Sequence, residues 1–147
     1  GLGDVYKRQG KPNAIIQANQ LVMSELPYSP SPQVDGLDEA SYLSPRVILG
    51  ENVKIKNSVI RGPVVIGDNV EITDSYVGPY TALGYGVQVI GSEIEASIVM
   101  RGSKLLNIPG RIDSSLVADN SIVEAATQRV PKSQRFVLAE NSYVQVG

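Results

Sequence analysis

The sequence contains no histidine, no cysteine and no tryptophan among its 147 residues. Without cysteine there are no disulfide bonds and no thiolate metal sites, which fits the cytoplasmic location that we expect. Without histidine the chain lacks the side chain that most often transfers protons near neutral pH. This absence narrows the catalytic chemistry of the chain more than any motif does.

Long apolar runs and an excess of basic residues are absent as well. No apolar stretch approaches the roughly 20 residues that a membrane-spanning helix needs. The formal net charge is −2 and is spread along the chain, whereas nucleic acids and anionic membranes bind basic patches. We therefore expect neither a nucleic acid nor a membrane as a partner.

An internal repeat of 17 residues dominates the sequence between about residue 47 and residue 123. Two apolar columns recur at this spacing: Ile55, Ile72 and Val89, and Leu49, Ile66, Leu83 and Met100. A glycine column follows in phase at Gly50, Gly67 and Gly84. Valine and isoleucine dominate, and the apolar positions advance in steps of 5 or 6, which favours three short strands per coil. Coils of equal length stack in parallel register about 4.8 Å apart, so the apolar columns are expected to fill the bore.

The segment Ile66–Ile72 (IGDNVEI) is a hexapeptide repeat with partners at 49–53 and 83–87. It resembles the left-handed parallel β-helix family. The handedness comes from this resemblance, because parallel crossover connections are otherwise overwhelmingly right-handed. The predicted fold class is all-β: a left-handed parallel β-helix of about 17 residues per coil, preceded by one α-helix. Hexapeptide acyltransferases and the related carbonic anhydrases use histidine as a base or metal ligand, so the sequence excludes both uses.

Five segments are expected along the chain: a non-native run-in at 1–9, a helix at 10–26 from the end of a missing catalytic domain, a linker at 27–46, the parallel β-helix at 47–125 and a C-terminal capping segment at 126–147. The helix is predicted from an apolar stripe of Ile15, Ala18, Val22 and Leu26. A second interpretation is that this helix folds back as a cap over the first coil, whose end is otherwise open. In the capping segment we expect a closing strand pair at 136–138 and 143–146.

Acidic residues supply few candidates for chemistry. Glu93 and Glu95 are predicted to share one face of a strand, because side chains two residues apart point the same way. The aspartates near expected corners are interpreted as solvated turn residues: Asp68, Asp74, Asp113 and Asp119. No catalytic, cofactor-binding or metal-binding residue is predicted in this chain.

Tyrosine, arginine and glycine motifs give no stronger signal. Tyr76, Tyr80 and Tyr85 lie within ten residues and could form one outer patch, although we expect isolated surface residues. Arg61 and Arg101 are 40 residues apart, which is no multiple of 17, so a shared anion site is not expected. The two G-x-G fragments, at 1–3 and 84–86, lack the strand-to-helix context of a phosphate loop.

Several segments carry a more specific resemblance. Gly10-Lys11-Pro12 followed by 18–22 (ANQLV) looks like the closing helix of the sugar nucleotidyltransferase catalytic domain. Segments 57–67 (NSVIRGPVVIG), 74–84 (DSYVGPYTALG) and 92–100 (SEIEASIVM) resemble the C-terminal β-helix of the long-form glucose-1-phosphate thymidylyltransferases in that family. The resemblance runs from residue 10 to about residue 147. Ala118 and Ala139 depart from it, because the family favours glycine at both positions.

The resemblance implies transfer of a nucleotidyl group from a nucleoside triphosphate to a sugar 1-phosphate with Mg²⁺, in a catalytic domain outside this sequence. We accordingly expect no cofactor in this chain and a non-catalytic β-helix that serves oligomerisation or regulation. The expected partners are further copies of the chain and the catalytic domain. Two alternatives stay open. One is a stand-alone hexapeptide-repeat acyltransferase or binding protein with Glu93 or Asp113 as its acid-base group, and the other is a uridylyltransferase of the same superfamily.

Overall fold

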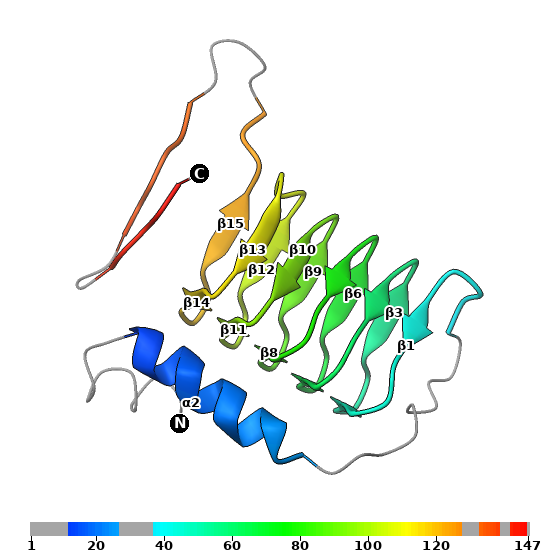
Figure 1. Cartoon of the computed structure of the whole chain (residues 1–147). Helices are drawn as coiled ribbons and strands as arrows, with labels where there is room; N and C mark the ends of the chain where they lie inside the picture. Colours follow the sequence, from blue (N-terminus) through cyan, green and yellow to red (C-terminus); the bar gives the residue numbers. More distant parts are fainter. Residues whose placement is uncertain (1–11, 27–36, 128–132, 139–141, 147) are drawn as a thin grey trace.

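The computed structural model describes residues 12–26, 37–127, 133–138 and 142–146. In these ranges the chain forms one helix, α2 (Pro12–Ser24), followed by strands β1 to β15. The strands wind into a parallel solenoid, and α2 runs along its side (Figure 1). The predicted parallel β-helix with one preceding helix is confirmed. The expected run-in at 1–9 and the first half of the expected linker, 27–36, lie outside the described residues.

Each coil contributes one strand to each of three parallel five-stranded sheets. We call them sheets A, B and C. Sheet A contains β1 (Tyr42–Leu43), β4 (Val59–Ile60), β7 (Tyr76–Val77), β10 (Glu93–Glu95) and β13 (Arg111–Asp113). Sheet B contains β2 (Val47–Leu49), β5 (Val64–Ile66), β8 (Thr81–Leu83), β11 (Ile98–Val99) and β14 (Leu116–Val117). Sheet C contains β3 (Lys54–Lys56), β6 (Glu71–Thr73), β9 (Gln88–Ile90), β12 (Lys104–Leu106) and β15 (Ile122–Glu124).

The stack begins before residue 47. β1 lies within the 27–46 segment that was expected to be a linker, and it pairs with β4 in parallel. The chain therefore has one more strand in sheet A than the predicted 47–125 solenoid would supply.

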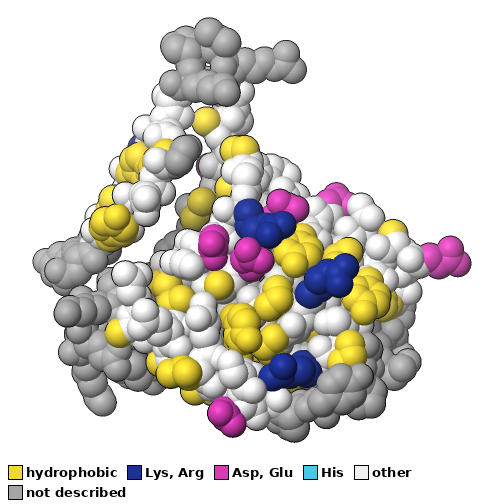
Figure 2. Space-filling view, in the orientation of Figure 1, with side chains coloured by type: hydrophobic (Ala, Val, Ile, Leu, Met, Phe, Trp, Pro, Cys, Tyr) yellow, Lys and Arg dark blue, Asp and Glu magenta, His cyan; other side chains and the backbone are white. Residues whose placement is uncertain are grey.

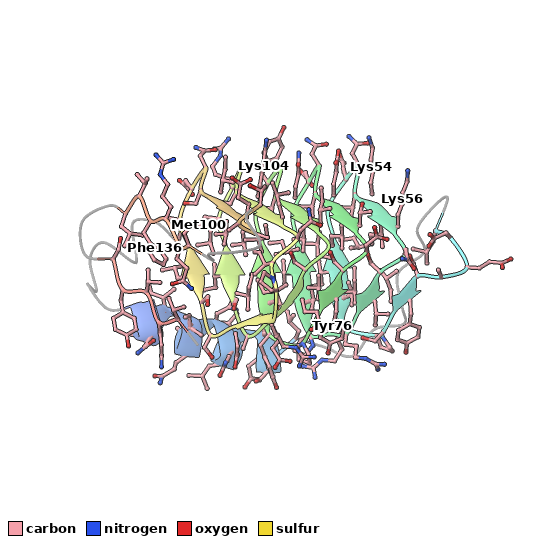
Figure 3. The ribbon with its side chains drawn as sticks, turned by 90° about the horizontal axis from the view of Figure 1, so that it is seen from above. Lys54, Lys56, Tyr76, Met100, Lys104 and Phe136 are labelled. Atoms are coloured by element: carbon pink, nitrogen blue, oxygen red, sulfur yellow. The ribbon has the colours of Figure 1, made fainter. Side chains whose placement is uncertain are left out.

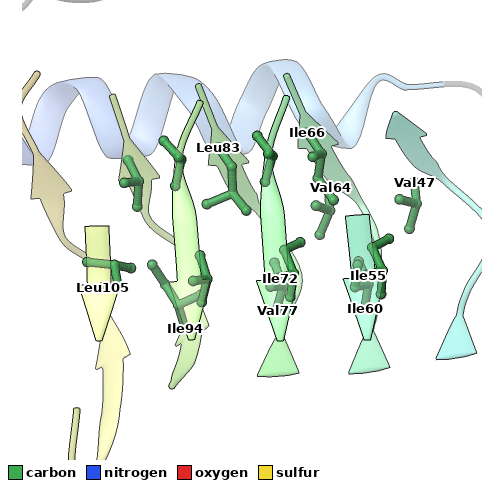
Figure 4. Close-up of a cluster of buried hydrophobic side chains, with 14 of the residues drawn as sticks. Val47, Ile55, Ile60, Val64, Ile66, Ile72, Val77, Leu83, Ile94 and Leu105 are labelled. Atoms are coloured by element: carbon green, nitrogen blue, oxygen red, sulfur yellow. The ribbon is translucent and has the colours of Figure 1, made fainter. Parts of the chain in front are cut away.

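The bore of the solenoid holds the hydrophobic core (Figure 4). Ile55 pairs in register with Ile72, and Ile72 with Val89, which continues to Leu105. Each of these four side chains is at most 4% exposed. Short strands with one inward residue between two outward ones explain why β-branched residues at 17-residue spacing specify this fold.

The strict 17-residue spacing breaks in the fourth coil. Leu83 pairs with Val99, a separation of 16, because the corner that holds Pro79 and Tyr80 in the third coil has only Ala96 in the fourth. The next coil is longer, since Glu93 pairs with Arg111, a separation of 18. Met100 was predicted to lie in the bore after Leu83, and this prediction is wrong. The slip turns Met100 outward, where it is buried with Ile15 of α2.

Serine side chains join successive coils at the corner that leads into sheet A. The hydroxyl of Ser75 donates to the Thr73 carbonyl at 2.7 Å and accepts from the backbone N–H of Ser92 at 3.2 Å. Ser58 does the same one coil earlier, donating to Lys56 and accepting from Ser75. All three serines are at most 7% exposed. They satisfy backbone groups that the turn leaves outside the ladder.

Left-handed backbone conformations and close contacts shape the other corners. Asn52, Asn69 and Gly86 occupy equivalent corner positions with φ of 57°, 60° and 69°, which suits asparagine and glycine. The glycines of the predicted column are needed for a different reason, which is the close approach of the next coil. A Cβ at Gly50 would lie 2.7 Å from the backbone nitrogen of Asp68, so glycine is required there by the approach of the next coil.

Helix α2 lies on the outer face of sheet B and does not cap the first coil (Figure 1). The predicted stripe is only partly right. Ile15 is 2% exposed, but Val22 is 67% exposed, and the helix instead buries Ile16 and Met23. Packing against sheet B therefore buries a face rotated from the predicted one, with Ile15 beside Ile98 of β11.

The C-terminal stretches at 133–138 and 142–146 extend beyond the last coil (Figure 1). Neither is assigned as a strand, so the closing strand pair expected at 136–138 and 143–146 is wrong as a strand assignment. Val137 is 88% exposed and Tyr143 is 81% exposed. In the last coil Ile122 is 62% exposed. The capping role of 126–147 stays a prediction, because 128–132, 139–141 and 147 lie outside the described residues.

Candidate functional site

The outer face of sheet A is where most of the predicted candidate residues come together. Tyr42, Val59, Tyr76, Glu93 and Arg111 are partners in register across its five strands. Alternation along the strands turns these side chains away from the bore. Seen from above, Tyr76 lies on one side of the solenoid and Lys54, Lys56 and Lys104 lie on the opposite side (Figure 3).

Tyr76 lies on the central strand of this face, where Gly78 leaves room for its ring. A Cβ at Gly78 would lie 2.9 Å from Cε1 of Tyr76 and 2.9 Å from the Glu95 Cβ. The guanidinium carbon of Arg111 lies 5.0 Å from the ring centroid of Tyr76, within cation–π range. Arg61 stands in the same relation to Tyr42, at 5.7 Å. Sheet A thus carries two arginine–tyrosine pairs.

Arg111 also binds the two predicted glutamates. Its Nη1 lies 3.3 Å from Oε1 of Glu95, and its Nε lies 4.0 Å from Oε2 of Glu93. The hydrogen bond with Glu95, then the charges of Glu95 and Glu93, raise the pKa of Arg111. The prediction that Glu93 and Glu95 share a face is confirmed, and Asp113 pairs in register with Glu95. In Figure 2 hydrophobic and basic side chains lie side by side on the visible face, with acidic side chains next to one of the basic groups.

The aspartates at the corners have mainly structural partners. Oδ1 of Asp68 accepts the backbone N–H of Glu51 at 2.8 Å, and Oδ1 of Asp74 accepts from the Asn57 side chain at 2.7 Å. Each contact joins neighbouring coils. Asp119 is exposed at the corner before β15. These three positions fit the interpretation as turn residues. Asp113 was also expected near a corner, but it is the last residue of strand β13 and pairs with Glu95.

The three tyrosines that lie within ten residues of one another in the sequence do not form one patch. Tyr76 lies on sheet A, and the Tyr80 carbonyl accepts from Asn19 of α2 at 3.3 Å. Tyr85 lies at the corner between β8 and β9, 5.7 Å from the Arg101 guanidinium carbon. Arg61 and Arg101 therefore stack on different tyrosines and share no anion site. The 84–86 glycine fragment forms this corner between two strands, whereas 1–3 lies outside the described residues.

Metal-binding geometry is not found in the described part of the chain. No group of three or more Asp, Glu, His or Cys side chains there could hold a metal ion. The Mg²⁺ that the resemblance implies therefore does not fit these residues, and no chemical step is assigned to it here. Among the described residues no helix has the length and apolar character to span a membrane.

Sequence reasoning missed Arg46, which holds α2 against the solenoid. Its Nη2 donates to three carbonyl oxygens at the end of the helix, those of Met23, Ser24 and Leu26, at 3.1 to 3.2 Å. A cation at this end also suits the helix dipole. No local signal marks Arg46, because its partners lie 20 to 23 residues earlier.

Comparison with known proteins gives a consistent picture. No protein-family model matches the chain. Glucose-1-phosphate thymidylyltransferases from Streptomyces griseus and Streptomyces antibioticus are 37% and 34% identical to it over 142 residues. Each match covers 96% of this chain and 38% of the relative, so the chain spans less than half the length of these curated relatives.

Among solved structures, a hexapeptide transferase family protein from Anaplasma phagocytophilum matches with a TM-score of 0.37 and 18% identity, over 71% of this chain and 80% of that one. The resemblance predicted from the sequence is confirmed by the curated relatives: along nearly its whole length this chain is similar to a part of the glucose-1-phosphate thymidylyltransferases.

Proposed function

We propose that this chain is the C-terminal, non-catalytic β-helix of a sugar-1-phosphate nucleotidyltransferase of the glucose-1-phosphate thymidylyltransferase type, and that it assembles the enzyme's subunits. Such an enzyme converts dTTP and glucose 1-phosphate to dTDP-glucose and pyrophosphate. The reaction, with its Mg²⁺, would take place in a catalytic domain outside these 147 residues.

The observation that carries this proposal is the partial match to the relatives. The chain aligns over 96% of its own length with 38% of proteins named for thymidylyl transfer. The aligned part is a solenoid whose described residues include no metal-holding cluster. Its best candidate base, Glu93, has a side chain that is 55% exposed and lies beside Arg111 on an open face. These features support a scaffold rather than a catalytic centre.

An assembly role is supported by the outer face of sheet A, which presents tyrosine and arginine, the residue types most enriched at protein interfaces. Soluble enzymes commonly form symmetric homo-oligomers, for which a rigid prism offers a repeatable surface. We also propose a cytoplasmic location for this protein, because the chain has no cysteine that could form a disulfide bond.

Two measurements on the purified chain test the proposal. With dTTP, glucose 1-phosphate and Mg²⁺ we expect no release of pyrophosphate, whereas the Streptomyces griseus relative serves as the active control. Light scattering should report a mass above that of one 15.7 kDa chain. Formation of dTDP-glucose by the chain alone would contradict the non-catalytic role. Acyl transfer from a coenzyme A thioester would instead support the stand-alone acyltransferase.

A further inference from the structure

The three outer faces of the solenoid differ in what covers them and in the side chains they carry. Sheet B lies under α2, whose Ile15 is buried with Ile98 and Met100. Sheet C carries outward lysines on the side opposite to Tyr76 (Figure 3): Lys54, Lys56 and Lys104. Sheet A carries two cation–π pairs: Tyr42 with Arg61 and Tyr76 with Arg111. Because lysine is depleted and tyrosine and arginine are enriched at interfaces, sheet A is the face best suited to a protein partner.

Charge is distributed unevenly along sheet A. Arg61 follows β4 and forms no ion pair with any residue in the ranges that the structure describes. At the other end, three carboxylates lie on the strands β10 and β13 around a single guanidinium, that of Arg111: Glu93, Glu95 and Asp113. The face is therefore positive at its second strand and negative at its fourth strand, whereas the charges of Arg111 and Asp113 on the fifth strand offset each other.

We propose that sheet A binds sheet A of a second copy of this chain, about a two-fold axis that runs along β7, with the two solenoids antiparallel. The inference rests on the assembly role proposed above. The rotation places β4 opposite β10 of the second copy and β1 opposite β13. Arg61 then faces Glu95 of the second copy, and Tyr42 faces Arg111 of the second copy. Each contact occurs twice, as in any isologous interface.

The charges favour this arrangement over the other two-fold arrangement. An axis parallel to the solenoid would place each coil against its own copy, so that the carboxylates of Glu93 and Glu95 on β10 face those of the second copy. Like charges held together at an interface cost several kcal/mol. The antiparallel arrangement replaces these repulsions with opposite charges. Its central strand is β7, where Gly78 accommodates the Tyr76 ring.

The size of the face limits the affinity. Five strands spaced about 4.8 Å apart extend roughly 20 Å along the solenoid, and each strand has only two or three residues, about 10 Å at most. The strands therefore cover well under the ~800 Å² per partner of a standard complex. We therefore expect a reversible dimer with a Kd of micromolar order. Its formation should weaken as salt concentration rises, because the ion pairs lie near the surface.

Charge reversal on the whole 147-residue chain tests this arrangement by sedimentation equilibrium over a concentration series. Arg61→Glu and Glu95→Arg should each raise the Kd of the dimer by about tenfold or more, since each places like charges opposite one another. An equimolar mixture of the two variants should dimerise again, because every cross-copy pair is then of opposite sign. Lys54→Glu, on sheet C, is the matched control and should leave the Kd unchanged. Circular dichroism checks that all variants are folded.

The outcomes separate the inference from the function on which it rests. A wild-type chain that stays monomeric at every concentration would overturn both the sheet A dimer and the assembly role. An oligomer that persists unchanged in Arg61→Glu, or a trimer, would overturn the sheet A arrangement while leaving assembly in place. Failure of the mixed variants to associate, with both folded, would likewise overturn the proposed pairing.

Discussion

Truncation of a single isoleucine in the bore provides a quantitative test of the fold. Ile72 is 0% exposed and stands between Ile55 and Val89 in register. Ile72→Ala removes three carbon atoms, worth about 0.8 kcal/mol each in transfer free energy, or roughly 2.4 kcal/mol. The neighbouring coils are held by backbone hydrogen bonds and cannot collapse fully, so a cavity term raises the expected loss to about 3–5 kcal/mol.

Ile48 is the matched control for this truncation. It lies on β2, pairs with Val65 and is 45% exposed, so Ile48→Ala removes the same atoms from a half-solvated position. About half of the transfer free energy applies and no closed cavity forms, which gives a loss of about 1 kcal/mol. The comparison cancels any intrinsic difference between isoleucine and alanine in strand propensity.

Urea denaturation followed by circular dichroism measures both losses. With a denaturant slope of about 2 kcal/mol per molar urea, Ile72→Ala should lower the midpoint by about 1.5 M or more, and Ile48→Ala by about 0.5 M. Equal midpoint shifts for the two variants would refute the assignment of Ile72 to the bore. A changed slope in Ile72→Ala would mean that the coils no longer unfold together.

Four further variants test individual contacts. Ala96 has a φ of 50°, so Ala96→Gly should raise the unfolding free energy by up to about 1 kcal/mol, and a lower urea midpoint would contradict this. Ser75→Ala leaves the buried N–H of Ser92 without its acceptor and should cost about 1–3 kcal/mol in the same assay. Arg46→Asn keeps a residue that tolerates the φ of 68° but loses the bonds to α2, so amide exchange in the helix should accelerate while exchange in the sheets does not. Hydrogen bonds from Ser41 and from a backbone N–H lower the pKa of Asp38. Its stabilising effect is therefore present above the unfolded pKa of about 3.9 and is lost as pH falls through the lower folded value, and Asp38→Asn should reduce this loss in acid melting curves.

Much of the fold follows from the local sequence pattern. The spacing of Ile55, Ile72 and Val89 identified one column of the bore, and all three residues are buried there. Asp68 and Asp74 were expected near corners, and each accepts a hydrogen bond from a neighbouring coil there. These features depend on residues that are equivalent from coil to coil, so a period in the sequence is enough to reveal them.

Contacts between different coils or elements were not predictable in the same way. Met100 lies outside the bore because the fourth coil has one residue fewer at a corner. Corners accept many residue types, so a missing corner residue does not visibly change the hydrophobic pattern of the sequence. The buried face of α2 was decided by its fit to sheet B, since Leu21 and Val22 are as apolar as Ile15 and Ile16 yet are exposed.

The sequence by itself determined that this protein is a stacked coil without histidine or cysteine chemistry, because period and composition are properties of the chain alone. The tertiary structure decided which surface the coil presents. Tyr76 and Arg111 are 35 residues apart in the sequence. They meet only because β7, β10 and β13 are neighbours in one sheet, and because the corner between β12 and β13 is longer than the equivalent corner one coil earlier. Such a contact depends on the lengths of all the intervening turns. The stacking of the coils determines these lengths, and a local sequence pattern does not reveal them.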